Sequence, residues 1–425
     1  MSNLHQTAAR LREQMCSFLG NLQRQVKNKT ARRFCREALY GIATRQSLHL
    51  TEIGRSLNEE IPLKKTENRL SRQVGRERLD EQVTDFVIDQ SAHRIKKDTL
   101  LIVDPSDVAK KYAEKMEYLT RVRDGSEGEL ANGYWLCQVI GVECGGHEIT
   151  PLVNHLWSHD HPDHLSENNE VLTCINRVAK HVGNRGIYVI DRGGDRMSIV
   201  DPLLRRERRF LIRLIGNRHL LFKGKAIFAE GLAELCPLPY KEIVTKEKKD
   251  GTEERLEISF GVRRVELPAF PGKKLWLVVV KGFGEKPLML LTTEEIKGSR
   301  KSIWWVVESY LTRWRIEETL RFAKQSYEIE DVRVLTYQRL KNMMALVLLV
   351  MSFTMTWLGQ KEKLAVLVHH ALEAGKNLFG IPDFRFYTLC NGIAEILGKR
   401  TKPVFKKEET LSQYEQLDMI FFSSG

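Results

Sequence analysis

The first 95 residues carry apolar side chains at helical spacing. Hydrophobic positions recur every three to four residues in 31–42 and in 50–57, and Pro62 stands where a third helix would begin. We therefore predict an all-helical N-terminal domain over residues 1–95, with room for a helix-turn-helix.

A candidate DNA-reading helix follows Pro62. Leu63, Leu70 and Val74 can face inward together, which leaves polar and basic positions outward, as a helix in the major groove needs. Surface helices of basic proteins often show the same pattern, so a solvated face stays open as an alternative. The outward positions are Lys64, Lys65, Asn68, Arg69 and Arg72.

From Thr99 the pattern changes to short runs rich in β-branched residues. They predict three strands, a helix and a fourth strand, which is typical of the opening of an RNase H-like α/β fold. A second helix and a fifth strand follow. The strands are expected at 99–103, 134–142, 148–156, 186–190 and 210–214, and the helices at 166–182 and 197–208.

Between 215 and 300 the helical spacing stops. Strand-like runs alternate there with Gly, Pro and charged turns, which predicts a β-rich insertion. A long helix is expected over 301–324, followed by an apolar helix and a basic tail. The expected domains are the helical DNA-binding domain 1–95, the RNase H-like catalytic core 96–214 and 301–360, the β-rich insertion 215–300, and a C-terminal helical tail 361–425 that is a candidate for dimerisation.

The charge of the chain points to a polyanionic partner. Lys and Arg number 67 against 55 Asp and Glu, so the net charge is +12. Residues 1–80 alone hold 16 Lys and Arg against 8 Asp and Glu. Nucleic acid is the commonest partner of such a chain, and the N-terminal segment is its expected DNA grip. An ordinary solvated pair of basic helices is the alternative.

The cysteines and the longest apolar run argue against a secreted or membrane protein. Seven cysteines form no close Cys-x-x-Cys pair, which is typical of reduced core thiols. The start of the sequence does not resemble a signal peptide. The apolar run 343–358 is shorter than the roughly 20 residues of a membrane span. We expect a cytoplasmic protein with no membrane partner, associated with the nucleoid when bound to DNA, and a buried helix at 343–358.

Two carboxylates follow buried strands. Asp104 comes after Leu100 to Val103, and Asp191 comes after Ile187 to Ile190. Because the first and fourth strands are neighbours in an RNase H-like sheet, both carboxylates would meet at one edge. Such carboxylates suit metal-dependent phosphodiester chemistry, which needs hard oxygen ligands. Taken singly, either could equally be a helix N-cap or a turn residue.

The helix expected at 301–324 carries a third acid among cations. Tyr310, Arg313, Glu317 and Lys324 project from one face, and Arg321 joins them, whereas Glu318 points away. A lone acid between cations suits a metal ligand flanked by phosphate contacts. A ladder of i,i+4 ion pairs on a solvated face is the alternative.

The spacing Tyr310-x2-Arg313-x3-Glu317-x6-Lys324 resembles the Y-x2-R-x3-E-x6-K signature of a branch of bacterial insertion-sequence DDE transposases. Asp104 in Ile-Val-Asp-Pro-Ser-Asp and Asp191 in Val-Ile-Asp-Arg-Gly-Gly-Asp look like the first and second acidic motifs of that branch. The likeness spans roughly 95–360. It departs at Ser106, where the branch often has Thr, and at Gly194, where it often has an aromatic residue.

The resemblance implies a DNA transposase in which Asp104, Asp191 and Glu317 hold two Mg²⁺ ions, with Mn²⁺ as a substitute. Tyr310, Arg313, Lys324 and Arg321 would contact DNA phosphates. Members of the branch often excise through a DNA hairpin, and a tryptophan of the insertion stacks on a flipped base. Trp276 is a candidate for that stacking by location, although an aromatic residue in a strand is more often core. The expected partners are double-stranded terminal repeats and target DNA, bound by a dimer.

One motif favours another class of enzyme. His159, His161, Asp163 and His164 resemble the zinc-ligand pattern of metallo-β-lactamase-type hydrolases. Such a hydrolase also needs later His and Asp ligands, and this reading leaves the Tyr310 to Lys324 face and the basic N-terminus unexplained. A DNA-binding relative of the transposase that no longer cuts is a third hypothesis, and the intact acidic positions argue against it.

Overall fold

The computed structural model describes residues 2–123, 128–247, 253–332, 334–373, 385–399 and 404–405. Contacts between Cα atoms divide the chain into two compact units, one made of Met1–Val83 with Phe322–Gly425 and one made of Thr84–Arg321. The expected C-terminal tail lies partly outside the described residues, namely at 374–384, 400–403 and 406–425.

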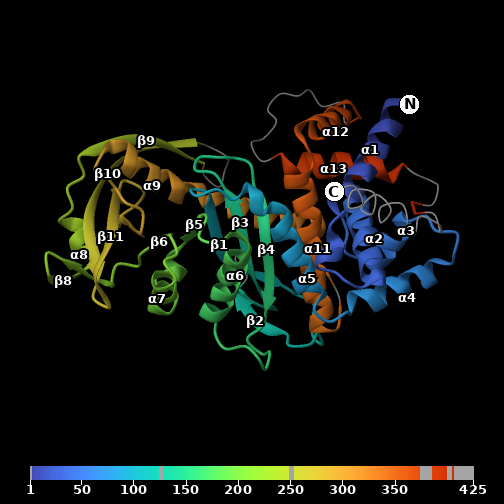
Figure 1. Ribbon diagram of the computed structural model, residues 1–425, viewed down its shortest axis with the longest axis horizontal. Helices are drawn as coiled ribbons and strands as arrows, with labels where there is room; N and C mark the ends of the chain where they lie inside the picture. The colour runs from blue at the N-terminus through green and yellow to red at the C-terminus, as the bar shows by residue number, and fades with distance from the viewer. Residues whose placement is uncertain are drawn as a thin grey trace, which may run out of the picture. The chain divides into compact units, whose positions relative to one another are not determined.

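The unit Thr84–Arg321 is a mixed α/β structure built on one large sheet (Figure 1). The strand order is β2-β3-β1-β5-β6-β12-β11-β10-β7-β8, with β4 paired to β3 and β9 paired to β10. The strands are β1 (Leu100–Ala109), β2 (Thr120–Arg123), β3 (Leu130–Val142), β4 (Thr150–Trp157), β5 (Ile187–Ile190), β6 (Phe210–Arg213), β7 (His219–Phe222), β8 (Lys225–Phe228), β9 (Tyr240–Glu247), β10 (Glu253–Leu267), β11 (Phe270–Lys281) and β12 (Leu288–Thr292).

The centre of the sheet pairs strands that are far apart in sequence. β1 runs parallel to β5, and β5 runs parallel to β6, whereas β1 and β3 are antiparallel. The neighbouring positions of the first and fourth expected strands, β1 and β5, are thereby confirmed. One expectation was wrong: β1 does not end before Asp104 but continues to Ala109, because β3 pairs with it all the way from Val142 to Gly133.

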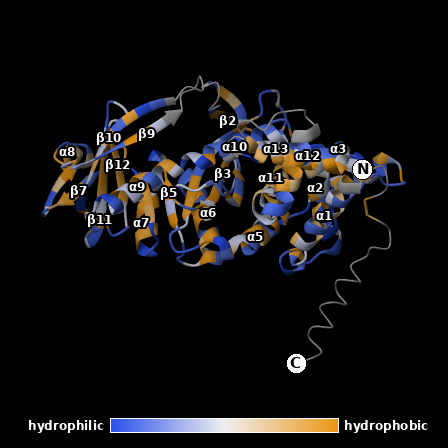
Figure 2. Ribbon diagram, turned by 90° about the horizontal axis from the view of Figure 1, so that it is seen from above, coloured by the Kyte–Doolittle hydropathy of each residue, from blue (hydrophilic) through white to orange (hydrophobic). Residues whose placement is uncertain are grey.

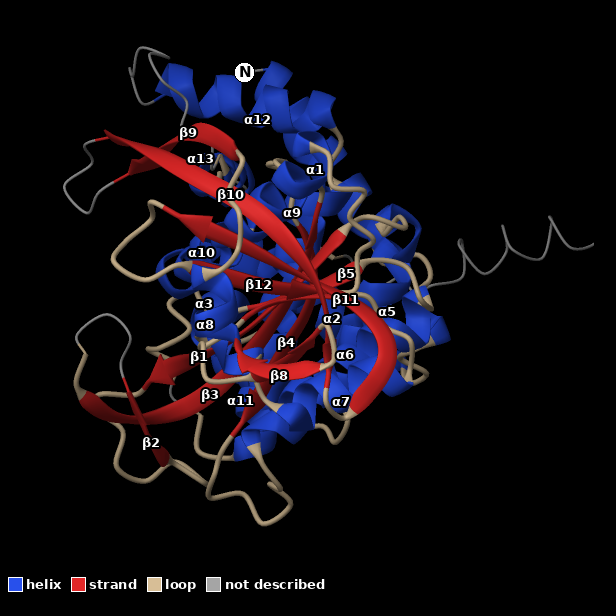
Figure 3. Ribbon diagram, turned by 90° about the vertical axis from the view of Figure 1, so that its left-hand side faces the viewer, coloured by secondary structure: helices blue, strands red, loops and turns tan. Residues whose placement is uncertain are grey.

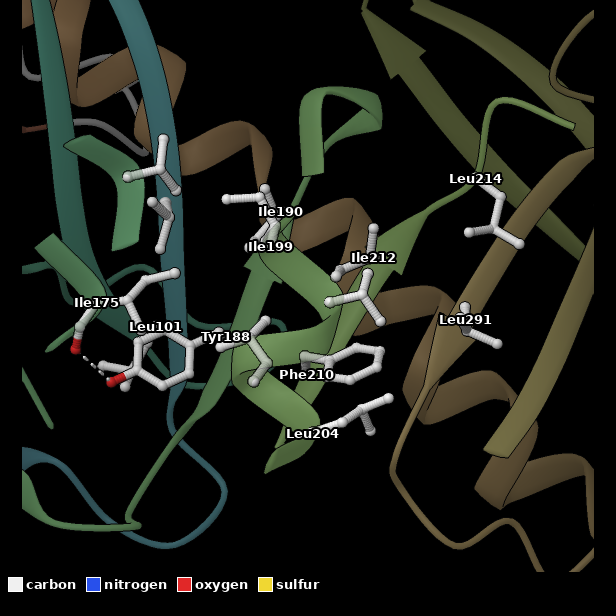
Figure 4. Close-up of a cluster of buried hydrophobic side chains, with 14 of the residues drawn as sticks. Leu101, Ile175, Tyr188, Ile190, Ile199, Leu204, Phe210, Ile212, Leu214 and Leu291 are labelled. Carbon is white, nitrogen blue, oxygen red and sulfur yellow. Dashed lines mark hydrogen bonds between the residues drawn. The ribbon is translucent and has the colours of Figure 1, made fainter. Parts of the chain in front are cut away.

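Helices α6 (Glu167–Val182) and α7 (Met197–Arg205) cover one face of this sheet with a hydrophobic cluster. In Figure 4, Ile175 of α6 lies beside Leu101 of β1 and Tyr188 of β5. The Tyr188 hydroxyl is satisfied within the cluster, since it donates a 3.2 Å hydrogen bond to the Ile175 carbonyl. Burial of these apolar side chains fixes which face of β1 and β5 is inward.

The strands expected in the insertion extend the same sheet. β12 pairs with β6 through Leu291 and Ile212, and β10 runs as one long curved strand (Figure 3). Helix α8 (Ala229–Glu234) lies between β8 and β9 in sequence. Gly261 on β10 has no room for a side chain, because a Cβ there would lie 1.9 Å from the Pro237 carbonyl oxygen.

The single helix expected at 301–324 is two helices. α9 (Arg300–Thr312) and α10 (Trp314–Tyr327) meet at Arg313. Tight backbone hydrogen bonds from Arg313 to Tyr310 and from Ile316 to Arg313, each 3.1 Å, replace the regular α-helical pattern there. The interruption was missed because Arg313 keeps a helical backbone conformation and the hydrophobic spacing runs through it.

The described elements of the other unit are helical, and α11 carries the apolar run 343–351. That helix is drawn largely in the hydrophobic colour in Figure 2. The stretch Tyr337–Trp357 is long and apolar enough to cross a membrane, but 89% of its most apolar part is buried inside the protein. The elements are α1 (Ser2–Phe18), η1 (Leu22–Arg24), α2 (Lys29–Arg45), α3 (Leu50–Ser56), α4 (Leu63–Val74), α11 (Tyr337–Met351), η4 (Ser352–Trp357), α12 (Gln360–Glu373) and α13 (Phe386–Gly398), while α5 (Leu79–Ser91) and η2 (Ala92–Arg94) lead to β1.

Helix α11 packs against α2 and α4. The contacts therefore group 322–425 with the N-terminal helices, whereas the domain scheme expected from sequence groups 301–360 with the catalytic core. The difference arises because an apolar helix shows that it is buried without showing which helices cover it.

Candidate active site

Asp104 and Asp191 follow paired positions of two parallel strands. Val103 of β1 is in register with Ile190 of β5, so the next residue on each strand is an aspartate at the same edge. Asp191 is the N-cap position of the short helix η3 (Arg192–Gly194). The antiparallel partner β3 keeps Asp104 in an extended strand, whereas Asp191 leaves the sheet at a turn.

Arg313 links Asp104 to Glu317. Its Nη2 atom donates a 2.6 Å hydrogen bond to Glu317 Oε1, and its Nη1 atom lies 3.7 Å from Asp104 Oδ1. Only 12% of the Arg313 side chain is exposed. Burial acts to lower the pKa of Arg313, but Asp104 and the other acidic neighbours outweigh it and raise that pKa above its ordinary value. The guanidinium thus stays charged between two carboxylates.

Tyr310 and Arg213 surround Asp191. The Tyr310 hydroxyl donates a 2.7 Å hydrogen bond to Asp191 Oδ1, and Arg213 Nη1 lies 3.6 Å from the same oxygen. Burial acts to raise the pKa of Asp191, but the Tyr310 hydrogen bond and the nearby arginines together lower it below its usual range. Burial and Asp191 raise the pKa of Tyr310 to about 12, so Tyr310 remains a neutral donor.

Asp104 is the acid most perturbed by this arrangement. Burial raises the pKa of Asp104 to about 7, against the opposing effect of Arg313 and with further repulsion from Glu317 and Asp191. The three carboxylates therefore share one electrostatic environment. Oxygen donors with excess negative charge are what a hard divalent cation binds, so the chemistry of this set fits such an ion.

The carboxylates are not gathered around an ion position in this conformation. Within the described residues, no group of three or more His, Cys, Asp and Glu side chains is close enough to hold a metal ion. The positive charges beside Asp104, Asp191 and Glu317 come instead from Arg313 and Arg213.

The two remaining basic residues of the expected face behave differently. Arg321 is exposed on α10. Lys324 forms an ion pair with Glu330, with 2.9 Å between Lys324 Nζ and Glu330 Oε1. Glu318 is bound by Arg315 at 2.9 Å and is not part of the Arg313 network.

Trp276 lies in β11, where it pairs with Thr292 of β12 and Arg264 of β10. Its side chain is partly buried. The structure therefore places Trp276 in the large sheet, on a strand between β12 and β10.

The histidine motif forms a hydrogen-bonded loop against α6. His164 Nδ1 lies 3.2 Å from Glu170 Oε1, and His155 Nε2 lies 2.7 Å from Glu170 Oε2. His161 Nδ1 accepts a 3.2 Å hydrogen bond from the Asp163 backbone, and the His159 ring stacks on Trp135. Among the residues that the structure describes, these histidines and Glu170 form no group that could hold a metal ion.

Sequence reasoning missed Arg213 and the pair Asp195–Arg218. Arg213 ends β6 next to Asp191, since Ile190 and Ile212 are in register on parallel strands. Asp195 binds the Arg218 guanidinium and accepts a 2.7 Å hydrogen bond from the Ile215 backbone. The expected strands 186–190 and 210–214 held the signal for Arg213, because residues after two parallel neighbours meet at one edge.

The N-terminal basic residues divide into two groups. Arg69 donates two 3.0 Å hydrogen bonds to Glu59 and lies 3.2 Å from Glu37, whose side chain is 2% exposed. Its guanidinium thus joins α4 to α2 and to the loop before α4. The four exposed candidates are Lys64, Lys65, Asn68 and Arg72.

Comparison with known proteins places the chain in a family. The family model described as "Transposase DDE domain" matches residues 95–353, more than half of the chain. No curated protein sequence matches the chain. Among solved structures, the chain is similar to the cryo-EM structure of a piggyBac transposase synaptic complex with hairpin DNA, at 12% identity and a TM-score of 0.41, over 92% of this chain and 76% of that chain.

DDE transposases generally use divalent metal ions, and they are polynucleotidyl transferases and endonucleases. The matched segment includes Asp104, Asp191 and Glu317, together with the elements that carry them. The chain therefore belongs to the DDE transposases and is an enzyme of DNA transposition.

Proposed function

We propose that this transposase cleaves and joins DNA strands at the ends of an insertion sequence, with Asp104, Asp191 and Glu317 as its metal-binding carboxylates. The observation that carries the proposal is the shared network around Arg313 and Tyr310. It couples three acids from β1, the end of β5 and α10. Acids from three separate elements lie close enough for Glu317 and Asp191 to raise the pKa of Asp104, and perturbed acids of this kind cluster at functional sites.

The strand order supports an RNase H-like core. Read from β4 through β3, β1, β5 and β6, the sheet has antiparallel strands first and parallel strands last. The two aspartates then lie at the carboxyl edge of the parallel strands, where α/β proteins place their reacting groups. On this proposal, β7 to β12 form the β-rich insertion, and Trp276 is its candidate for stacking on DNA.

We propose Mg²⁺ as the ion, two per site, with Mn²⁺ as a substitute. When bound, such ions supply Lewis-acid stabilisation to the attacking and leaving oxygens of phosphodiester cleavage. The chain provides the rest. Asp104, Asp191 and Glu317 hold the ions, and Tyr310, Arg313, Arg321 and Lys324 contact DNA phosphates by charge-assisted or neutral hydrogen bonds.

The exposed face of α4 is the proposed grip on terminal-repeat DNA. Lys64, Lys65, Asn68 and Arg72 project from one helix, and phosphate contacts by such residues account for much of DNA affinity. Binding as a dimer to both transposon ends and to target DNA, in the cytoplasm, belongs to the same proposal, as does the division into domains at residues 95, 214, 300 and 360.

The experiment compares Glu317→Gln with Glu318→Gln in the full chain, on DNA that carries the flanking ends of the encoding element. Glu317→Gln should abolish Mg²⁺-dependent cleavage and leave DNA binding in gel-shift assays intact, because it removes one charged ligand. Glu318→Gln is the control, since Glu318 is bound to Arg315. Cleavage by Glu317→Gln above about a tenth of the wild-type rate would refute the assignment, since loss of a metal ligand costs far more. Cleavage by neither variant nor wild type would support the inactive relative.

A further inference from the structure

A row of polar residues crosses three strands beside Asp104. In the pairing of β1, β3 and β4, Asp104 is opposite Gln138, and Gln138 is opposite Asn154. Paired residues of neighbouring strands share a face of the sheet, with Cβ atoms roughly 5 Å apart. The row is therefore a continuous polar strip that begins at the candidate metal site.

The strip lies on the face away from the hydrophobic cluster. The neighbouring row of paired residues, Val103, Val139 and Val153, belongs to the cluster that α6 and α7 cover, and each of them is adjacent in sequence to a residue of the strip. Successive side chains on a strand point to opposite faces, so Asp104 and Asn154 point away from that cluster, together with Gln138 between them.

Gln138 is buried with one polar end unused. The residue is 2% exposed, and its Nε2 atom donates a 3.0 Å hydrogen bond to Asn154 Oδ1. Its Oε1 atom is buried and accepts no hydrogen bond from the described part of the chain. Buried amide oxygens almost always have a partner, so an oxygen held in this state next to Asp104 calls for one.

We propose that Gln138 helps to hold the divalent cation of the active site by supplying an uncharged oxygen beside Asp104. This inference rests on the proposed function of Asp104 as a metal ligand. The hydrogen bond to Asn154 uses the nitrogen end of the amide, which leaves the oxygen end for the cation or its hydration shell. Carbonyl oxygens are ordinary partners of hard cations. Here an amide adds an oxygen without adding a fourth negative charge to three carboxylates that already repel one another.

A structural role is the competing explanation. Gln138 and Asn154 would then serve only to join β3 and β4 by a cross-strand hydrogen bond. That role predicts a loss of stability on substitution and no change in metal binding. The two roles can therefore be separated by measuring the melting temperature and the metal affinity of the same variants.

The test is a titration of the full chain with Mn²⁺ in the absence of DNA. Electron paramagnetic resonance measures the free Mn²⁺ at each step of the titration. Gln138→Met keeps the volume and removes both polar atoms, and Gln138→Met/Asn154→Leu also removes the partner left behind. Both should raise the Mn²⁺ dissociation constant by about tenfold, the lower end of what loss of a supporting contact costs a metal site. Thr150→Val is the matched control, as a buried polar residue elsewhere on β4. It should bind Mn²⁺ like the wild type.

Gln138→Glu puts an oxygen at both terminal positions of the side chain, so one oxygen is kept whichever way the amide of Gln138 is turned. This variant should bind Mn²⁺ more tightly than the wild type. Unchanged Mn²⁺ affinity in a folded Gln138→Met variant overturns the inference. If Gln138→Met fails to fold, unchanged or weaker binding by Gln138→Glu overturns it. The variant Asp104→Asn distinguishes a failure of the proposed metal site from a failure of the role proposed for Gln138. If it binds Mn²⁺ as the wild type does, the proposed metal site itself is wrong. If it binds more weakly while every Gln138 variant matches the wild type, only the role of Gln138 is lost.

Discussion

Tyr310 donates a 2.7 Å hydrogen bond to Asp191 Oδ1, joining residues 119 positions apart in the chain. The bond connects helix α9 to the turn that follows β5. It favours the charged form of Asp191 despite burial, and it keeps that carboxylate beside the Arg313 network. The hydrogen bond to Asp191 gives Tyr310 a role in the site that needs no contact with DNA. This role is compatible with the proposed contact of Tyr310 with a DNA phosphate.

Tyr310→Phe should slow cleavage by roughly ten- to a hundredfold, because a hydrogen bond to a charged group contributes about 1.5–3 kcal/mol. Single-turnover cleavage of end-bearing DNA measures the effect. Tyr240→Phe is the control, since it removes a hydroxyl whose 3.0 Å bond goes to the Gly298 carbonyl, outside the Arg313 network. Equal rates for Tyr310→Phe and the wild type would show that the Asp191 contact has no part in the reaction.

Substitutions of Arg69 and Lys65 should have different effects, although both residues lie on α4: the first should lower stability and the second should weaken DNA binding. Arg69→Ala leaves Glu37 buried with Arg33 as its remaining cation, so unfolding free energy in urea should fall by about 2 kcal/mol, below the full cost of an unpaired buried charge. Lys65→Ala should leave stability unchanged. It should weaken DNA binding and reduce the salt dependence by about one phosphate contact.

The opposite pattern would contradict this division. If Arg69→Ala leaves urea denaturation unchanged but weakens DNA binding, Arg69 contacts DNA as the sequence alone predicts. The full chain is the proper material, because the compact unit that contains α4 also includes residues 322–425.

His181 should make stability depend on pH. It lies 3.5 Å from Asp85 and also binds Asp89. The interaction with Asp85 raises the pKa of His181, outweighing burial, and Asp89 adds to it. A raised pKa in the folded state stabilises the fold fully below the ordinary value of 6.5, and this contribution is lost as pH rises through the raised pKa.

His181→Gln should therefore lower the melting temperature on the acidic side of that range, by roughly 2–4 °C for about 1 kcal/mol. The difference from the wild type should shrink as pH rises. Asp85 stays ionised throughout, since its own pKa is lowered: burial raises it, but His181 and Arg177 outweigh burial. A difference that is constant with pH would mean that His181 acts through packing alone.

The histidine loop should be dispensable for cleavage. His159→Ala/His161→Ala should retain Mg²⁺-dependent cleavage within about twofold, because changes away from the reacting groups have small effects. His159 stacks on Trp135 and His161 accepts from its own loop. Purified protein that carries stoichiometric zinc, lost in the double variant together with activity, would instead favour the hydrolase interpretation.

The sequence by itself determined the identity and order of most elements near the site. The runs before Asp104 and Asp191 predict buried strands, and β1 and β5 are parallel neighbours as expected. Helical spacing, a local property of the chain, also put Tyr310, Arg313 and Glu317 on one face, although it did not predict the break between α9 and α10 at Arg313. Hydrophobic periodicity shows which side of an element is buried, and the positions of these residues were inferred from that information alone.

Only the tertiary structure decided which partners the polar side chains take. Arg69 is bound by Glu37 and Glu59, and Lys324 by Glu330, and spacing alone predicted none of these ion pairs. Gln138 stands beside Asp104 because two strands pair in one register and not in another. Such pairings depend on residues tens to hundreds of positions apart. Periodicity does not encode them, since it records burial and is silent about what covers each buried face.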